Sequence, residues 1–306
     1  MAAPTGDQLD VPVVLIVFNR PDKTRRVFAQ IAHQRPRQLF VISDGPRDNR
    51  ADDLELVHES RVITEQVDWP CEVTRLYSSV NLGCRARILS GLDYVFESVP
   101  KAIILEDDCL AHDDFFKFAD ELLSRFAKEP RVFSIGGHIW EYPDEFVDDG
   151  YFFSKYFSSW GWATWADRWR LVDSELRAWP SVRMTNFLRD WAESPMENVY
   201  WEKVFELVFR HESPFDEAWD YAVQFTMWMH DLLAVRPSVN LVQNLGFDES
   251  ATHTRMASVT ISDRVARNLE WPINHPQVVT RNHEVDALVN EIRIGGAFRN
   301  HLKSRS

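Results

Sequence analysis

Short apolar runs of strand length recur through the first 130 residues, and each is followed by a segment with helical spacing. The first run, residues 11–18 (VPVVLIVF), is continuous and β-branched, which is typical of a strand buried on both faces. Strands are predicted in this half at residues 11–18, 39–43, 71–77 and 102–105. Helices are predicted at residues 22–33, 53–67, 85–96 and 115–128. Repeated β-α units of this length predict an α/β fold with a mainly parallel sheet and helices on both faces.

The second half of the chain has the same kinds of segment in a less regular order. Strands are predicted there at residues 132–135, 151–157, 233–235 and 239–242. Helices are predicted at residues 198–210, 221–230 and 284–292. Between them, residues 159–169 (SWGWATWADRW) carry four tryptophans. Because no internal repeat, low-complexity segment or flexible linker separates the halves, we expect one compact domain.

Polar side chains stand where three of the predicted strands end. Asn19-Arg20 follows the first strand, Asp44-Gly45 the second, and Glu106-Asp107-Asp108 the fourth. The carboxyl ends of parallel strands meet at one edge of the sheet, where ligands bind. Three carboxylates at the end of a buried strand are costly unless a cation meets them, and Mg²⁺ or Mn²⁺ prefers oxygen ligands. The alternative is an exposed acidic turn that caps the following helix; the position at the ligand-binding edge favours the metal.

Composition and charge exclude several classes of protein. The 306 residues include 34 Lys and Arg against 47 Asp and Glu, a net charge of −13 that argues against nucleic-acid binding. The three cysteines are far apart, which is not a disulfide framework. The N-terminus lacks the features of a signal peptide, and no apolar run reaches the roughly 20 residues of a transmembrane helix. We therefore expect a cytoplasmic protein without a transmembrane segment.

Several segments together resemble a known family. AIILEDDCLAHDDFFKFADELL, from residue 102, resembles the metal-binding segment of GT-A fold nucleotide-sugar glycosyltransferases. It is most similar to the N-acetylglucosaminyltransferase I type, whose motif is a Glu-Asp-Asp variant of D-x-D. FVISDGPR and NLGCRARILSGLDYVFE resemble the second strand and the helix before the metal motif. SWGWATWADRW, EAWDYAVQFTMW and NLVQNLGFDESATHT resemble segments of related bacterial family 2-like transferases.

The resemblance implies a single catalytic domain with a GT-A, Rossmann-like fold at residues 10–260. Its nucleotide-binding half would be residues 10–130 and its acceptor half residues 131–260. Residues 261–306 would form a C-terminal extension packed on the domain.

The resemblance also implies roles for single residues. Asp108 would ligate Mn²⁺ or Mg²⁺ directly, with His253 as a second protein ligand. Asp107 would bind the donor sugar or its ribose. Arg20 and Asp44 would hold the nucleotide, Asp44 by accepting a hydrogen bond from the uracil N3–H.

Further donor and acceptor residues follow from the same resemblance. Either Arg85 or Arg87 would approach the diphosphate or base, and the choice between them stays open. Asp220 is nominated as the base that deprotonates the acceptor hydroxyl, with Glu217 as the alternative; by default, an Asp at the start of a helix is only a cap.

The tryptophan cluster has both a core and a sugar-binding interpretation. Trp165 and Trp169, four residues apart, are expected to be buried from one helix face. Trp160 or Trp162 is expected near the sugar or acceptor, and Trp162 is the nominated donor contact.

The function implied is a metal-dependent, inverting transfer of a sugar from a UDP-sugar to a hydroxyl of a glycan or other acceptor. UDP-GlcNAc is the favoured donor because the family it resembles most uses it. One alternative is a nucleotidyltransferase that makes a nucleotide sugar, but NRPDKTRR after the first strand has no glycine. Another is a non-catalytic carbohydrate-binding protein on a transferase fold, against which the intact acidic triplet argues.

Overall fold

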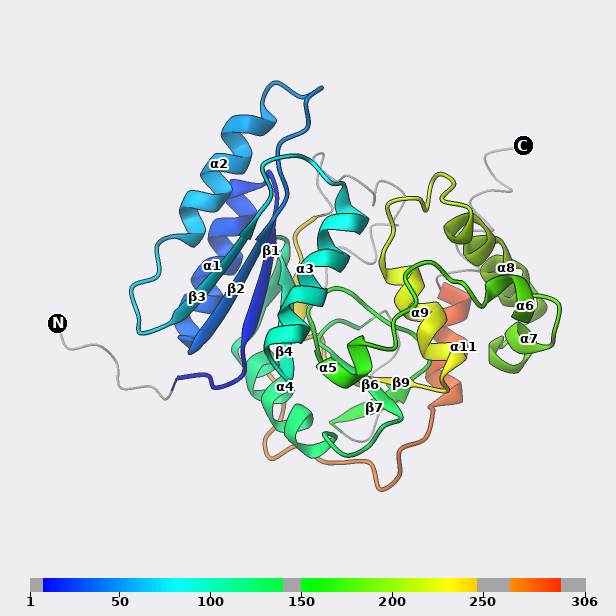
Figure 1. Ribbon diagram of the computed structural model, residues 1–306. Coiled ribbons are helices and arrows are strands. Elements are labelled where there is room, and N and C mark those ends of the chain that lie inside the picture. Colours follow the sequence, from blue (N-terminus) through cyan, green and yellow to red (C-terminus); the bar gives the residue numbers. More distant parts are fainter. Residues whose placement is uncertain (1–7, 140–149, 247–264, 293–306) are drawn as a thin grey trace.

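The computed structural model describes residues 8–139, 150–246 and 265–292. An eight-stranded sheet with the order β3-β2-β1-β4-β8-β6-β9-β7 runs through the molecule (Figure 1). Its strands are β1 (Val13–Val17), β2 (Gln38–Ser43), β3 (Glu72–Tyr77), β4 (Lys101–Glu106), β6 (Val132–Gly136), β7 (Tyr151–Ser154), β8 (Trp162–Trp165) and β9 (Leu233–Pro237). A separate pair joins β5 (Cys109–Ala111) to β10 (Val242–Asn244) in antiparallel fashion.

The first four strands are parallel, and the direction changes only at β8 and β7. Strand β8 lies antiparallel to both β4 and β6, so β6 and its parallel neighbour β9 run in the same direction as β4. Strand β7 is antiparallel to β9. The predicted α/β class with a mainly parallel sheet is confirmed, and the continuous sheet joins both halves in one domain.

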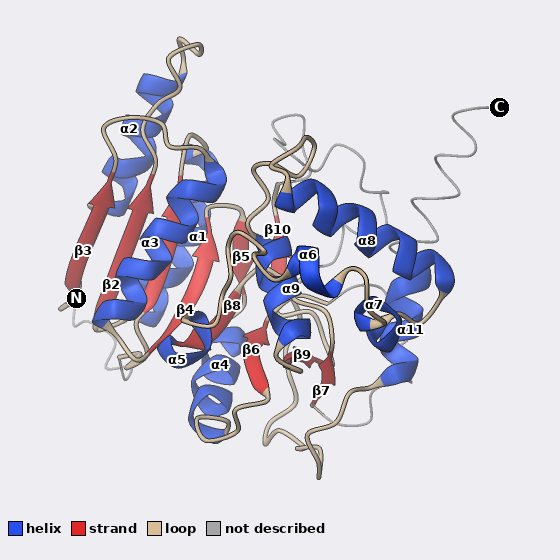
Figure 2. Ribbon diagram, turned by 45° about the vertical axis from the view of Figure 1, so that its right-hand side comes forward, coloured by secondary structure: helices blue, strands red, loops and turns tan. Residues whose placement is uncertain are grey.

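Helices cover both faces of the sheet (Figure 2). They are α1 (Pro21–Gln34), α2 (Asp53–Thr64), α3 (Cys84–Ser98), α4 (Asp113–Arg125), α5 (Ala166–Trp169), α6 (Trp179–Val182), α7 (Phe187–Trp191), α8 (Pro195–Phe209), α9 (Asp220–Met229) and α11 (His283–Asn290). The alternation of side chains along β1 explains the two layers. Val13 and Leu15 belong to the core cluster that includes residues of α1, α2 and α4, whereas Val14 and Ile16 belong to the cluster that includes α3 and aromatic residues of α8 and α9.

The tryptophan run adopts a conformation that the sequence pattern did not predict. Residues 162–165 form the central strand β8, so Trp162 and Trp165 point to opposite faces of the sheet. Trp165 and Trp169 are both buried, as expected. The prediction that Trp165 and Trp169 share a helix face was wrong. Trp165 ends strand β8, and Trp169 lies in α5 on the other face of the sheet.

The described C-terminal residues pack against both halves of the sheet. The Trp271 indole N–H donates to Asp114 at the start of α4, and Lys117 lies over the Trp271 ring. Helix α11 lies beside β7, where the Asp286 carboxylate accepts hydrogen bonds from the Ser154 hydroxyl and the Lys155 N–H. In the described part of the chain, no helix is both long and apolar enough to cross a bilayer.

A buried ion pair links Lys155, the residue after β7, to Glu197 of α8. The Lys155 ammonium lies 2.7 Å from a Glu197 carboxylate oxygen, and both side chains are 0% exposed. The Tyr156 hydroxyl donates to the same carboxylate at 2.5 Å. Burial lowers the pKa of Lys155 to about 8, and the Glu197 charge opposes that shift.

We expect Lys155→Met to lower the free energy of unfolding by about 3–5 kcal/mol, because Glu197 would keep an uncompensated buried charge. Lys155→Met combined with Glu197→Gln is expected to recover a large part of that loss, since the glutamine is neutral and still accepts from Tyr156. Urea unfolding of both variants measures the difference. A double variant no more stable than Lys155→Met would contradict a direct coupling between the two groups.

Candidate functional site

The polar turns after β1, β2 and β4 lie together at the carboxyl edge of the parallel strands. The arrowheads of β2 and β3 mark this edge in Figure 2. Ile16 of β1 stands opposite Glu106 of β4, so the residues that follow each strand meet beyond the sheet. The Phe18 N–H donates to Asp107 Oδ2 at 3.2 Å and fixes the Asp107 side chain at this edge.

Arg20 joins the two aspartates of the acidic triplet. Its guanidinium nitrogens lie 2.7 Å from Asp107 Oδ1 and 2.7 Å from Asp108 Oδ2. The side chains of Asp107 and Asp108 are 2% and 12% exposed, and the Arg20 side chain is 21% exposed. Arg20 and the triplet were predicted at one edge of the sheet, and the guanidinium is in direct contact with both aspartates there. We refer to Arg20, Asp107 and Asp108 as the edge cluster.

The triplet carries more negative charge than Arg20 neutralises. Burial raises the pKa of Glu106 to about 8, and the neighbouring Asp108 and Asp107 raise it further. Burial likewise raises the pKa of Asp107 to about 6, although Arg20 opposes that shift. Burial beside other carboxylates disfavours the charged forms of Glu106 and Asp107, so further positive charge would stabilise them. Carboxylate oxygen atoms suit a hard divalent cation.

The chain returns to the triplet after β10. The Leu245 N–H donates to the Asp108 carbonyl at 2.7 Å, and a Cβ on Gly246 would lie 2.4 Å from Asp108 Oδ2. Only glycine allows this close approach. His253, the predicted second metal ligand, lies outside the described residues. Within the described ranges no group of three or more His, Cys, Asp or Glu side chains is placed to hold a metal ion together.

Asp44 fixes the loop between β3 and α3. Its two carboxylate oxygens accept hydrogen bonds from the N–H groups of Gly45, Leu82 and Gly83 at 2.9–3.0 Å, and from the Asn81 side chain at 3.0 Å. These donors take up the acceptor positions of the carboxylate. In this structure Asp44 therefore holds residues 81–83 in place, a contribution that the sequence analysis did not include.

Arg85 and Arg87 are both bound within the protein. The Arg85 guanidinium lies 3.0 Å from His211 Nδ1 and 3.1 Å from Glu175 Oε1, and it also contacts the Ser174 carbonyl. The Arg87 guanidinium donates to the Leu76 carbonyl at 2.8 Å. Arg85 thus links the start of α3 to the second half of the chain, whereas Arg87 links α3 to β3.

Arg61, which was not predicted as a residue of this edge, joins the ends of β2 and β3 by hydrogen bonds. Its guanidinium donates to the Ser43 hydroxyl at 2.9 Å and to the carbonyls of Asp44 and Ser78 at 2.8 Å. Arg61 lies in α2, within an ordinary amphipathic pattern, so no local signal marks it.

Two carboxylates from the second half approach the same edge. Glu217 accepts a hydrogen bond from the Arg85 N–H at 3.2 Å and so caps the start of α3. Asp220 is the first residue of α9. Burial raises the pKa of the Cys84 thiol, and the charges of Glu106, Glu217 and Asp220 raise it further. Asp220 also raises the pKa of Glu106, so Asp220 is within electrostatic reach of the triplet.

The nominated donor contact Trp162 is a core residue. It is 0% exposed, and its ring packs on Phe157, Trp169 and Trp219 at centroid distances of 5.0–6.1 Å. A ring enclosed in this way has no open face for a sugar, which corrects the expectation for Trp162. Trp160 is half-buried, with its ring in edge contact with His138 at 4.5 Å.

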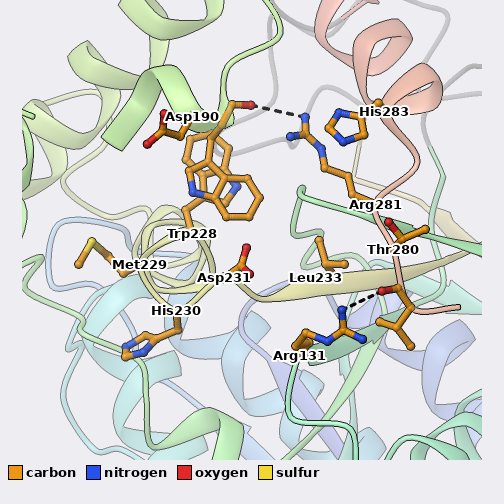
Figure 3. A pocket seen from close by; sticks show the side chains of 12 residues that line it. Arg131, Asp190, Trp228, Met229, His230, Asp231, Leu233, Thr280, Arg281 and His283 are labelled. Carbon is orange, nitrogen blue, oxygen red and sulfur yellow. Dashed lines mark hydrogen bonds between the residues drawn. The ribbon is translucent and has the colours of Figure 1, made fainter. Parts of the chain in front are cut away.

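A cavity of about 670 Å³ lies at the opposite edge of the sheet (Figure 3). It opens beside Arg131 and Leu233, at the starts of β6 and β9, which run in the same direction as β4. Trp191 stacks on Trp228 with ring centroids 5.6 Å apart, and the Arg281 guanidinium also lies over the Trp191 ring, 5.8 Å from its centroid.

Comparisons with known proteins give the fold a limited context. No family model matches the chain, and no curated protein matches it. Mannosyltransferase PcManGT from Pyrobaculum calidifontis, in complex with GDP-Man and Mn²⁺, is similar at 13% identity and a TM-score of 0.35, over 52% of this chain and 45% of that chain. The present chain thus matches less than half of that enzyme's length.

Nucleotidyltransferases are similar to a comparable degree. A UDP-glucose pyrophosphorylase complexed with UDP-glucose has 9% identity and a TM-score of 0.36, over 74% of this chain and 90% of that chain. A cytidylyltransferase from Leptospira borgpetersenii has 9% identity and a TM-score of 0.33, over 56% and 66%. All three similar proteins are transferases. At these TM-scores the similarity carries no argument about function, which rests on the residues of this chain.

Proposed function

We propose that the chain is a divalent-metal-dependent glycosyltransferase that transfers a sugar from a UDP-sugar to a hydroxyl group with inversion. The observation that carries the proposal is the edge cluster. Two buried aspartates there share one positive group, the Arg20 guanidinium, at the carboxyl edge of the parallel strands. The resemblance described above makes UDP-GlcNAc the favoured donor and a glycan the favoured acceptor.

The residues present fit part of a metal site. Asp108 would ligate Mn²⁺ or Mg²⁺, Asp107 would bind the donor sugar or ribose beside it, and His253 would add an imidazole. When bound, the metal would neutralise the negative charge that develops on the diphosphate leaving group. The charge imbalance of the triplet, with the pKa of Glu106 and of Asp107 raised by burial, supports a need for a cation here.

Helix α1 begins at the edge that would hold the diphosphate, at Pro21 directly after Arg20. The start of α3 is instead occupied by the Glu217 carboxylate, which accepts the Arg85 N–H. Helix N-termini present unpaired N–H groups and partial positive charge, which favour phosphate oxygens. The chain's own backbone thus supports binding of an anionic donor despite the net charge of −13.

Asp220 is the base that this proposal assigns to the acceptor hydroxyl. Its charge acts on Glu106 of the triplet, which supports a position within reach of the donor. Glu217 already accepts the Arg85 N–H at the start of α3. Glu217 remains the alternative base.

The nucleotidyltransferase alternative has less support from the residues. The turn between β1 and α1 carries Asn19 and Arg20 but no glycine. It therefore lacks the glycine-rich backbone whose successive N–H groups bind a triphosphate. A thermal-shift panel of nucleotide sugars and nucleoside triphosphates, each with and without Mn²⁺, separates the two functions. A UDP-sugar at a hundred times its Kd is expected to add about 2.7 kcal/mol of stability. Stabilisation by UTP or CTP but by no nucleotide sugar would favour the alternative.

Asp44→Ala is expected to lower the free energy of unfolding by about 2 kcal/mol, because the N–H groups of Leu82 and Gly83 lose a charged acceptor. If the uracil N3–H replaces one of these internal donors on Asp44 when UDP binds, the same variant loses discrimination between UDP and CDP, since cytosine has no N3–H. Urea unfolding measures the first effect, and titration with the two nucleotides measures the second. Equal binding of UDP and CDP by the unmodified protein would contradict a uracil-reading role for Asp44.

A further inference from the structure

The guanidinium of Arg20 stands where a cation shared by Asp107 and Asp108 would stand. Each of its two terminal nitrogens is 2.7 Å from a different carboxylate. The backbone of Arg20 is fixed, because its carbonyl accepts from both the N–H and the hydroxyl of Thr24 at 2.9 Å. The Arg20 side chain is 21% exposed, the largest exposed fraction of the three side chains in the edge cluster.

Arg20 and a divalent cation cannot both use the same carboxylate oxygens at full strength. Asp108 Oδ2 is already paired with Arg20, and Gly246 packs against this same oxygen, which leaves little room for a second cation beside it. Two like charges at one site also repel. A cation that binds Asp108 through this oxygen must therefore loosen or replace the Arg20 contact.

A guanidinium released from Asp108 needs a new anionic partner. Arginine presents a planar fork of donors that matches phosphate as well as carboxylate oxygens. Helix α1 begins at the next residue, so a diphosphate bound at its N-terminus would lie near the arginine backbone.

We propose that Arg20 is an exchangeable counter-ion of the site, which holds Asp107 and Asp108 while no metal is bound and moves to the donor diphosphate when the metal takes its place. The inference rests on the proposed function and adds that binding of the metal and binding of the donor diphosphate depend on each other. Metal and nucleoside diphosphate are then coupled: either ligand alone binds weakly, because only the two together replace both partners of the ion pair. By linkage, each ligand raises the affinity for the other by the same factor.

The test is a titration of Mn²⁺ alone, and of Mn²⁺ in the presence of saturating UDP, with free Mn²⁺ followed by electron paramagnetic resonance. In the unmodified protein we expect UDP to tighten Mn²⁺ binding. In Arg20→Gln, which removes the internal competitor, Mn²⁺ alone is expected to bind about tenfold more tightly, and the tightening by UDP is expected to shrink by about the same factor. A merely structural role for Arg20 would not raise the affinity for Mn²⁺.

Arg131→Gln is the matched control. It removes one positive charge from the same protein, but its partner Glu129 lies at the opposite edge of the sheet. We expect it to leave both Mn²⁺ affinities unchanged. Arg20→Lys is the second variant, which keeps the charge without the fork and is expected to lie between the unmodified protein and Arg20→Gln.

The outcomes separate the two proposals. Unchanged or weaker binding of Mn²⁺ alone by Arg20→Gln and Arg20→Lys, with coupled UDP and Mn²⁺ binding retained in the unmodified protein, would overturn the counter-ion role and leave the glycosyltransferase proposal standing. Absence of any Mn²⁺-dependent UDP binding in the unmodified protein would overturn both.

Discussion

Asp108→Asn is expected to abolish Mn²⁺-dependent binding of UDP and of UDP-sugars, with a loss on the order of 100-fold or more in affinity. The physical reason is that the metal loses its carboxylate ligand and the diphosphate loses its bridge to the protein. Asparagine keeps the size of the side chain but cannot carry the charge that also pairs with Arg20. Isothermal titration with UDP in the presence of Mn²⁺ measures the effect.

Asp113→Asn is the matched control for Asp108→Asn. It lies five residues further along the same segment, and its carboxylate accepts from the exposed Gln34 side chain rather than from the edge cluster. We expect UDP affinity in this variant to match that of the unmodified protein. Retention of Mn²⁺-dependent UDP binding by Asp108→Asn would remove Asp108 from the metal site.

Asp220→Asn is expected to lower the rate of sugar transfer by about 10²–10⁴-fold, because an amide cannot take the proton of the acceptor hydroxyl. Donor affinity is expected to change little, since Asp220 is proposed to touch only the acceptor. Slow hydrolysis of the donor, with water as the acceptor, provides the assay when no acceptor is known.

Glu217→Gln provides the comparison for Asp220→Asn. Glutamine can still accept the Arg85 N–H that Glu217 accepts at the start of α3, so the helix cap survives. We expect close to full activity in this variant. Full activity in Asp220→Asn together with a large loss in Glu217→Gln would exchange the roles of the two residues, and full activity in both would point to a mechanism without a protein base.

The order of strands and helices in the first half was predictable from local pattern alone. Strand β1 and helix α1 are each specified by a continuous apolar run or by helical spacing within a single segment. The position of the acidic triplet followed from the same pattern, because parallel strands place their carboxyl ends at one edge. The contact of Arg20 with Asp107 and Asp108 is a consequence of that topology, since β1 and β4 are neighbours.

The partners of the other charged residues were not predictable in this way. Arg85 binds His211, and its N–H binds Glu217, more than 120 residues away in sequence. Neither pairing leaves a periodic trace in the chain. Four residues of β8 are too short for a period-2 signal, and its last residue, Trp165, matched a helical spacing with Trp169. Local pattern therefore predicted where the site lies, whereas tertiary contacts decide which side chains are available to a ligand.

The most direct measurement of the central claim is the anomalous X-ray scattering of manganese in crystals grown with Mn²⁺ and UDP. The account predicts a manganese peak about 2.0–2.3 Å from an Asp108 carboxylate oxygen, in contact with the UDP diphosphate, at the carboxyl edge of β4. UDP bound at that edge without a metal, or manganese bound only elsewhere, such as in the cavity beside Arg131 and Arg281, would contradict it.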